Sequence, residues 1–353
     1  MKTPTIDFVG RSRQWAMISA VLLLLSIGSL LIGGLSLSID FVGGTAYRLE
    51  DVRGDLTAED LRQAAEGAGA TDVVAQVQTD GDTAVGGLVR TEAFDPGSDE
   101  DLALRAALQE AADTEEATVS FVGPTWGERI TVQMTEALLV FLVVVVIYIS
   151  FRLEFKMAVA SVIALVHDVL ITIGLYSLVG FNVSPATVIA ILTILGYSLY
   201  DTVVVFDRVK ENSASLGEPG RRTYAQLVNG SMNEVLYRSI NTSVTSLLPV
   251  GALLLIGSQV LGATTLQDLA LALFIGMAVG IYSSLFVAGP FLAWAKMREP
   301  EQRKLAAKAE KLAAEGIDDD ATIASAAAAP EARAPVTTEY VRGQGRGKKR
   351  RKR

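Results

Sequence analysis

Six apolar runs, each long enough to cross a membrane, are the feature that most constrains the fold of this 353-residue chain. A helix needs about 20 mostly apolar residues to cross the roughly 30 Å hydrocarbon core of a bilayer. Half of the residues are hydrophobic and only 20% are charged, which fits such a chain. The predicted spans are residues 15–35, 131–151, 157–179, 185–206, 239–261 and 266–294. The sequence therefore predicts a polytopic α-helical membrane protein with six transmembrane helices.

The basic residues of the connecting segments predict its orientation. Lys and Arg occur before the first span, between the second and third, between the fourth and fifth, and after the sixth, whereas segments 180–184 and 258–265 contain none. By the positive-inside rule, both termini are then cytoplasmic. The predicted domains are a cytoplasmic N-terminus (1–14), the first transmembrane helix (15–35), an external domain (36–130), transmembrane helices two to six (131–295) and a cytoplasmic tail (296–353).

The external segment is strongly acidic, and its pattern predicts a small α+β domain. Thr57 and Asp60 form a capping-box pattern for a helix that ends at Gly67, and Ser98 is placed to cap a second helix. Alternating or apolar stretches predict strands at 46–52, 72–79, 83–94 and 117–122. The resulting β-α-β-β-α-β order is typical of the ferredoxin-like fold. No catalytic constellation stands out here, and the acidic residues are interpreted as a solvated face.

Asp201 interrupts the fourth apolar run and is the strongest functional candidate. An ionised aspartate near the centre of a bilayer costs roughly 2.5 to 3.5 kcal/mol, so it requires a partner, a water path or a proton. Tyr197 and Arg208 lie four residues before it and seven after it, which predicts one shared helical face flanked by Ser198. Asp207 and Arg208 are interpreted as interfacial charges at the end of this helix.

Other polar residues fall within the third and fifth predicted spans. Arg238 either lies beside Asp201 and keeps it ionised, or extends to the cytoplasmic interface. Asn241 follows on the same helix. His167 and Asp168 form either a structural interhelical pair or a polar pair that titrates near physiological pH.

Five motifs in order resemble the SecF family, an accessory subunit of the bacterial Sec protein-export machinery. They extend over nearly all of the chain from 15 to 294 and are Ile39-Asp-Phe-Val-Gly-Gly-Thr45, Val122-Gly-Pro-Thr-Trp-Gly127, Ala164-Leu-Val-His-Asp-Val169, Leu195-Gly-Tyr-Ser-Leu-Tyr-Asp-Thr-Val-Val-Val-Phe-Asp-Arg208 and Arg238-Ser-Ile-Asn-Thr-Ser243. The residues that match the family motifs include Asp40, Gly43, Gly44, Asp207 and Arg208. One departure is Tyr200, which stands where Asn often precedes the aspartate.

The resemblance implies half of a pseudo-two-fold fold of the resistance-nodulation-division (RND) superfamily, completed by a SecD-like subunit. It also implies association with the SecYEG channel of the bacterial cytoplasmic membrane, a functional link to SecA, and an unfolded exported polypeptide as substrate. Late steps of export would then draw on the proton-motive force. Asp201 matches the proton-responsive carboxylate of the family and Arg238 its basic partner, with His167, Asp168, Tyr197, Ser198 and Asn241 as supporting polar residues.

Two other functions stay open from the sequence: half of an RND-type exporter of lipids or small molecules, and a passive scaffold of the translocation channel. An enzyme is not expected, because no phosphate-binding Walker loop is present. Neither a cofactor nor a metal is expected, since the chain has one histidine and no cysteine. The basic cluster at 348–353 would meet anionic lipid or RNA phosphates, or would simply keep a disordered tail soluble.

Overall fold

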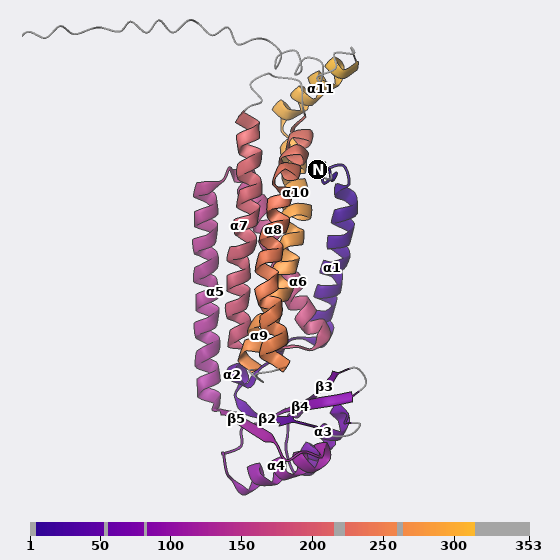
Figure 1. Cartoon of the computed structure of the whole chain (residues 1–353). Coiled ribbons are helices and arrows are strands. Elements are labelled where there is room, and N and C mark those ends of the chain that lie inside the picture. The colour runs from indigo at the N-terminus through magenta and orange to yellow at the C-terminus, as the bar shows by residue number, and fades with distance from the viewer. Residues whose placement is uncertain (1–4, 53–55, 81–82, 215–222, 260–263, 315–353) are drawn as a thin grey trace, which may run out of the picture.

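The computed structural model describes residues 5–52, 56–80, 83–214, 223–259 and 264–314. It consists of a bundle of long helices with a small α/β domain at one end (Figure 1). The first described residues, from 5 onward, and the last described helix lie at the opposite end of the bundle. The basic cluster at 348–353 and the loop arginines Arg221 and Arg222 lie outside the described residues.

Five helical stretches are long and apolar enough to cross a membrane. They are α1 (Ser12–Gly33), α5 (Pro124–Arg152), α6 (Phe155–Val179), α7 (Pro185–Ala214), and a continuous run formed by α9 (Thr264–Ser283), the π-helical turn η1 (Ser284–Ala288) and α10 (Gly289–Met297). The helix α8 (Tyr224–Gln259), which covers most of the predicted fifth span, is not among these five within the described residues. Its crossing of the membrane therefore stays a prediction.

The apolar core of the bundle lies among α6, α7, α8, η1 and α10. Met157, Leu195, Phe206, Met232 and Leu292 are among its fully buried side chains. By contrast, α1 and α5 expose most of their apolar side chains, and they lie at the two sides of the bundle in Figure 1. Helix α5 begins at Pro124, earlier than the predicted span, because proline is favoured in the first helical turn.

The α/β domain has the element order that the sequence predicted. Its elements are β2 (Gly44–Glu50), α3 (Ala58–Gly67), β3 (Val74–Asp80), β4 (Thr83–Thr91), α4 (Asp99–Ala112) and β5 (Ala117–Val122). The strands form a four-stranded sheet of order β3-β4-β2-β5 in which all neighbours are antiparallel. Tyr47 and Leu49 of β2 pack with Leu61 of α3 and Leu104 of α4, so both helices cover the sheet face away from the bundle (Figure 1).

Both predicted helix caps of this domain are confirmed. The Thr57 side chain accepts a hydrogen bond from the backbone N–H of Asp60, and the Asp60 carboxylate accepts one from the backbone N–H of Thr57. Ser98 Oγ accepts from the backbone N–H of Asp101 and opens α4. These contacts satisfy backbone donors that a helix N-terminus otherwise leaves free.

The other face of the sheet faces the bundle, and a set of short elements joins the two. The short helix α2 (Ile39–Val42) precedes β2, and the two-residue strands β1 (Ser36–Leu37) and β6 (Asn182–Val183) pair in parallel. The Arg90 guanidinium donates to Ser36 Oγ and to the Leu37 carbonyl. Gln76 of β3 donates to the Gly180 carbonyl at 2.7 Å. The sequence did not predict β1, α2 or β6.

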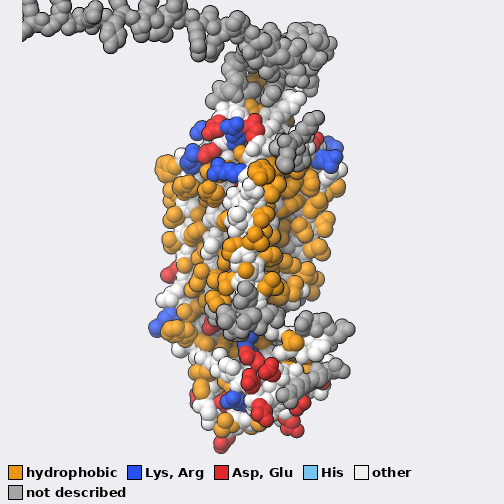
Figure 2. Space-filling view, viewed as in Figure 1, with side chains coloured by type: hydrophobic (Ala, Val, Ile, Leu, Met, Phe, Trp, Pro, Cys, Tyr) orange, Lys and Arg blue, Asp and Glu red, His pale blue; other side chains and the backbone are white. Residues whose placement is uncertain are grey.

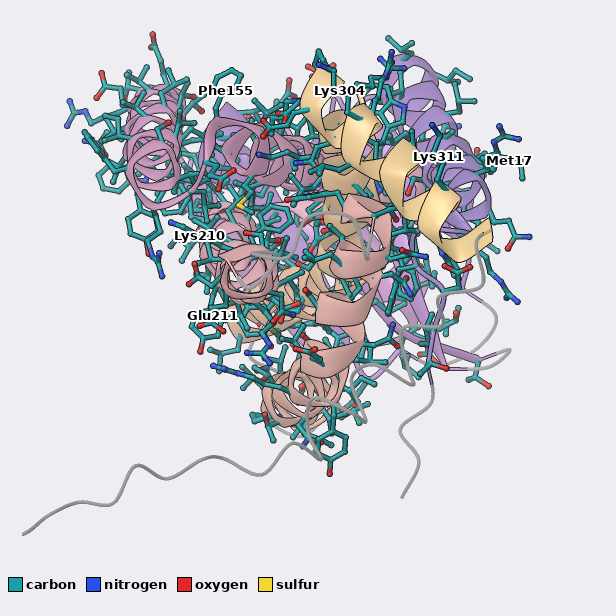
Figure 3. The ribbon with its side chains drawn as sticks, turned by 90° about the horizontal axis from the view of Figure 1, so that it is seen from above. Met17, Phe155, Lys210, Glu211, Lys304 and Lys311 are labelled. Carbon is teal, nitrogen blue, oxygen red and sulfur yellow. The ribbon has the colours of Figure 1, made fainter. Side chains whose placement is uncertain are left out.

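Charged side chains are divided between the two ends of the molecule. Lys and Arg gather at the end near the N-terminus, whereas acidic residues dominate the visible face of the α/β domain (Figure 2). At the basic end, Lys156 pairs with Glu299 at 2.9 Å and Lys296 with Glu154 at 2.8 Å. The helix α11 (Pro300–Ala314) crosses that end of the bundle, with Lys304 and Lys311 along it (Figure 3).

Candidate functional site

Three of the polar contacts between α7 and α8 come from one face of α7. Tyr197 donates to Ser246 Oγ at 2.9 Å, Asp201 accepts from Ser239, and Arg208 pairs with Glu234. These α7 residues are the three that the helical spacing predicted to share a face. All of them therefore point toward the same neighbouring helix.

The Asp201 carboxylate lies near the middle of α7 and is buried, with 8% of the residue exposed. Its Oδ1 accepts a hydrogen bond of 2.8 Å from Ser239 Oγ of α8. Its Oδ2 is buried as well and has no hydrogen-bond partner among the described residues. A buried carboxylate oxygen without a donor is costly when it is charged, because it has lost its water without gaining a replacement. The site is therefore suited to holding a proton.

Arg238 is adjacent to Ser239 in the chain but does not form an ion pair with Asp201 among the described residues. Its side chain is exposed, and Nη2 donates to the Tyr200 hydroxyl at 3.3 Å. Asn241 is exposed one turn further along α8. A direct contact with Asp201 was one of two alternatives that the sequence left open, and the structure does not show it.

His167 and Asp168 form a second buried polar centre within the bundle. His167 Nδ1 lies 3.1 Å from Asp168 Oδ1, and Asp168 Oδ2 accepts from Ser198 of α7 at 2.6 Å and from Ser283 of α9 at 2.8 Å. The other imidazole nitrogen, Nε2, is buried without a hydrogen-bond partner in the described part of the chain. Ser198 therefore joins the Asp168 centre, whereas Asp201 bonds to α8. The His167 ring also stacks on Tyr282 at 6.0 Å.

Several hydroxyl groups in these two centres were not singled out from the sequence. Ser239 lies within a motif quoted above, but serines in membrane helices often bond to their own backbone and carry little signal. Ser283 and Ser284 stand at the start of the π-helical turn, where Ser284 Oγ lies 3.0 Å from Thr202 Oγ1 of α7. The adjacent Ser283-Ser284 pair inside an apolar run was the available signal. Single π-helical turns inside α-helices are frequent at functional sites.

The remaining family-motif residues lie at the two ends of the bundle. Asp40 belongs to α2, where its carboxylate accepts from Ser38, and Gly43 and Gly44 follow with φ of 77° and 130°. A Cβ on Gly44 would lie 2.5 Å from the Thr91 carbonyl oxygen, so this position requires glycine. At the basic end, Asp207 pairs with Arg152. These residues position elements and lie outside the Asp201 centre.

The α8 surface opposite the bundle core carries a stripe of exposed side chains, most of them polar. Arg238, Asn241, Thr245 and Leu248 recur at helical spacing and are all exposed. Charged and amide side chains in a membrane span almost always face protein or water, because lipid cannot bond to them. In the described part of the chain, no three His, Cys, Asp or Glu side chains come together in a way that could hold a metal ion.

Comparisons with known proteins show which family the chain belongs to. The family model described as protein export membrane protein SecD/SecF, C-terminal, matches residues 103–298. A protein named protein translocase subunit SecF from Streptomyces coelicolor is 38% identical over 97% of this chain and 94% of its own length. The chain belongs to the SecF family. A SecF from Mycobacterium tuberculosis is 40% identical over 84% of this chain and 68% of its own length.

SecF sequences also occur within longer chains. A protein translocase subunit SecDF from Thermus thermophilus is 38% identical to this chain. The match covers 85% of this chain and 40% of that protein. The crystal structure of SecDF from Thermus thermophilus, a translocon-associated membrane protein, matches with a TM-score of 0.71 and 37% identity over 84% of this chain and 39% of that one. A SecDF in a super-membrane-facing form matches with a TM-score of 0.60. This SecF-family chain therefore corresponds to less than half of a SecDF chain.

Proposed function

We propose that this chain is an accessory subunit of the protein translocase in the bacterial cytoplasmic membrane, where it pairs with a SecD-like subunit. In this proposal α8 also crosses the membrane, as the fifth of six transmembrane helices, and both termini are cytoplasmic. The pair acts with the SecYEG channel on unfolded polypeptides after SecA-driven insertion, and it uses the proton-motive force to promote late steps of export. Support comes from the relatives named SecF and SecDF and from the division of charge between the two ends.

The observation that carries proton coupling is the Asp201 carboxylate, which is buried near the middle of α7 with one oxygen lacking a donor. Protonation would neutralise this oxygen and change the contact with Ser239, and so the packing of α7 against α8. One charge moved through 100 mV supplies about 2.3 kcal/mol. That amount shifts a two-state equilibrium by more than tenfold if protonation and conformation are coupled.

The exposed polar stripe of α8 supports a partner subunit. Facing lipid, Arg238 and Asn241 would be unfavourable, because lipid offers their polar groups no hydrogen-bond partner. A second helical subunit against this stripe would remove that cost. It would also cover the α8 side of the Asp201 site. The SecDF relatives are consistent with such a second half, because this chain matches only part of each.

The test replaces Asp201 with asparagine, which preserves size and hydrogen bonding but cannot titrate. In vesicles containing the complete complex, the Asp201→Asn variant should lose the stimulation of export by a proton gradient and export at the rate measured without one. Glu211→Gln is the matched control, because Glu211 forms an exposed pair with Arg208 at the end of the same helix. Normal gradient-stimulated export by Asp201→Asn would refute proton coupling. Loss of the complex during purification would instead favour the scaffold function.

A further inference from the structure

A cleft of about 720 Å³ lies between the α/β domain and the end of the bundle. Its lining includes Arg48 of β2, Ala75 to Thr79 of β3, Val179 at the end of α6, and Asp268 of α9. In Figure 1 the β3 strand lies at the bundle-facing side of the domain. Clefts of roughly 300 to 1,000 Å³ are the usual size of ligand sites. The cleft is separate from the Asp201 centre.

The first observation concerns the edge of the sheet. β3 is an outer strand of the four-stranded sheet, so it pairs with β4 on one side only. Consecutive residues of a strand point to opposite faces, and all five residues from Ala75 to Thr79 line the cleft. The cleft therefore runs along the edge of β3. In the described part of the chain, no backbone hydrogen bond from another element reaches this outer edge. Such an edge is a template for an added strand.

The second observation concerns the opposite wall. It combines apolar side chains with amide and charged ones, contributed by the ends of α6 and α9 and the segment after α6: Tyr176, Val179, Phe181, Asn182, Gln267, Asp268 and Leu271. A lipid chain would favour a wholly apolar wall. An extended peptide presents both side chains and main-chain amides. The apolar side chains of this wall can pack against peptide side chains, and its amide and charged groups can bond to the peptide main chain.

The third observation concerns charge. Arg48 lies on the sheet face that faces the bundle, and burial lowers the pKa of its guanidinium, whereas the carboxylate of Asp268 acts in the opposite sense. The guanidinium remains charged at neutral pH, because an arginine starts far above that range. The cleft thus offers a donor for peptide carbonyls and, at Asp268, an acceptor for peptide amides. Gln76 bridges the strand to the Gly180 carbonyl and fixes the two walls relative to each other.

We propose that this cleft binds an extended segment of an unfolded polypeptide, which adds to β3 as a fifth strand of the sheet. This inference rests on the proposed function, since a protein translocase subunit acts on unfolded chains. It assigns substrate contact to the junction between the α/β domain and the bundle.

Photo-crosslinking of the complete complex tests this proposal. A benzophenone amino acid is placed at Val85 or at Val179, which both line the cleft and are 46% and 54% exposed. Leu102 of α4, also 54% exposed and outside the cleft, is the matched control. With an exported protein arrested midway, the Val85 and Val179 positions should crosslink to it several-fold more than the Leu102 position does. Crosslinks to another subunit or to lipid instead, equal yields at all three positions, or no crosslink would overturn the proposal.

A second measurement uses the absence of cysteine from the chain. A Val179→Cys variant is labelled with a bulky maleimide in spheroplasts, and a Leu102→Cys variant serves as the control. Labelling at position 179 alone should slow export several-fold, and unchanged export after complete labelling would refute the cleft. Because both experiments keep Asp201, they can fail while proton coupling holds. Conversely, crosslinking can succeed even if the Asp201→Asn variant exports normally.

Discussion

At the scale of single residues, the two buried carboxylates in the described part of the bundle differ in how many hydrogen bonds their oxygens accept. Asp168 is held by two serine hydroxyls and by His167, whereas Asp201 has one hydroxyl donor and one oxygen without a partner among the described residues. A fully bonded carboxylate fixes helices in place, because each of its contacts resists movement. The less satisfied one is better suited to exchange a proton. We therefore propose that Asp168 is a structural centre and Asp201 the switching one.

In the α/β domain, the hydrogen bond between the Tyr47 hydroxyl and the buried Asp101 carboxylate can be tested through the pH dependence of stability. Burial and the hydrogen bond of 2.6 Å to Asp101 raise the pKa of the Tyr47 hydroxyl above its ordinary value of about 10. The unfolded chain then releases this proton at lower pH than the folded chain, so the stability of the domain should fall as pH rises above about 10. The Tyr47→Phe variant should lose about 1 to 3 kcal/mol at neutral pH and show a weaker dependence at alkaline pH. Hydrogen exchange of β2 amides in the full chain measures both effects, and identical pH profiles would contradict the assignment.

The sequence predicted residues whose signal is local. Asp201 stood out because a carboxylate is rare in an apolar run, and Thr57 and Ser98 because a cap depends on the next three residues. Ser239 could not be assigned in the same way, since its role depends on the packing of α8 against α7. The exposure of Arg238 likewise follows from how α8 is rotated in the bundle, which spacing alone does not determine.

At the scale of elements, the connection from α2 to β2 determines how the domain meets the bundle. Gly44 has φ of 130° and lies against the Thr91 carbonyl. The two-residue strands β1 and β6 and the π-helical turn η1 are too short to show a periodicity in the sequence, so the sequence could not predict them. The long helices and the four-stranded sheet, in contrast, followed from hydropathy and alternation.

The Gly44→Ala variant should therefore strain this connection. A Cβ would lie 2.5 Å from the Thr91 carbonyl oxygen in a backbone conformation that L residues avoid, which costs of order 1 to 3 kcal/mol. Gly123→Ala is the control, because a Cβ there meets nothing within 4 Å and the residue has an ordinary φ of −66°. Hydrogen exchange at β2 and β4 should show the loss in Gly44→Ala alone. Equal protection in both variants would contradict the steric argument.

At the scale of the whole molecule, the division of charge predicts the orientation in the membrane. Because the chain has no cysteine, a single introduced cysteine is the only thiol in it that a maleimide can label. A Leu102→Cys variant in the α/β domain should react with a membrane-impermeant maleimide added to intact spheroplasts. A Lys304→Cys variant on α11 should react only after the membrane is permeabilised. The reverse pattern would invert the proposed topology.

The exposed stripe of α8 predicts where the second half of the complex binds. Thr245 lies on this stripe between Asn241 and Leu248, and a bulky side chain there would separate two packed helices. Thr245→Trp should therefore lower the amount of SecD-like subunit that copurifies with the chain several-fold. Leu24→Trp is the control, because Leu24 is 70% exposed on the apolar surface of α1, where a large side chain suits lipid. If both variants retain the partner equally, the stripe is covered by something other than a SecD-like helix, since leaving Arg238 in lipid is unfavourable for the reason given above.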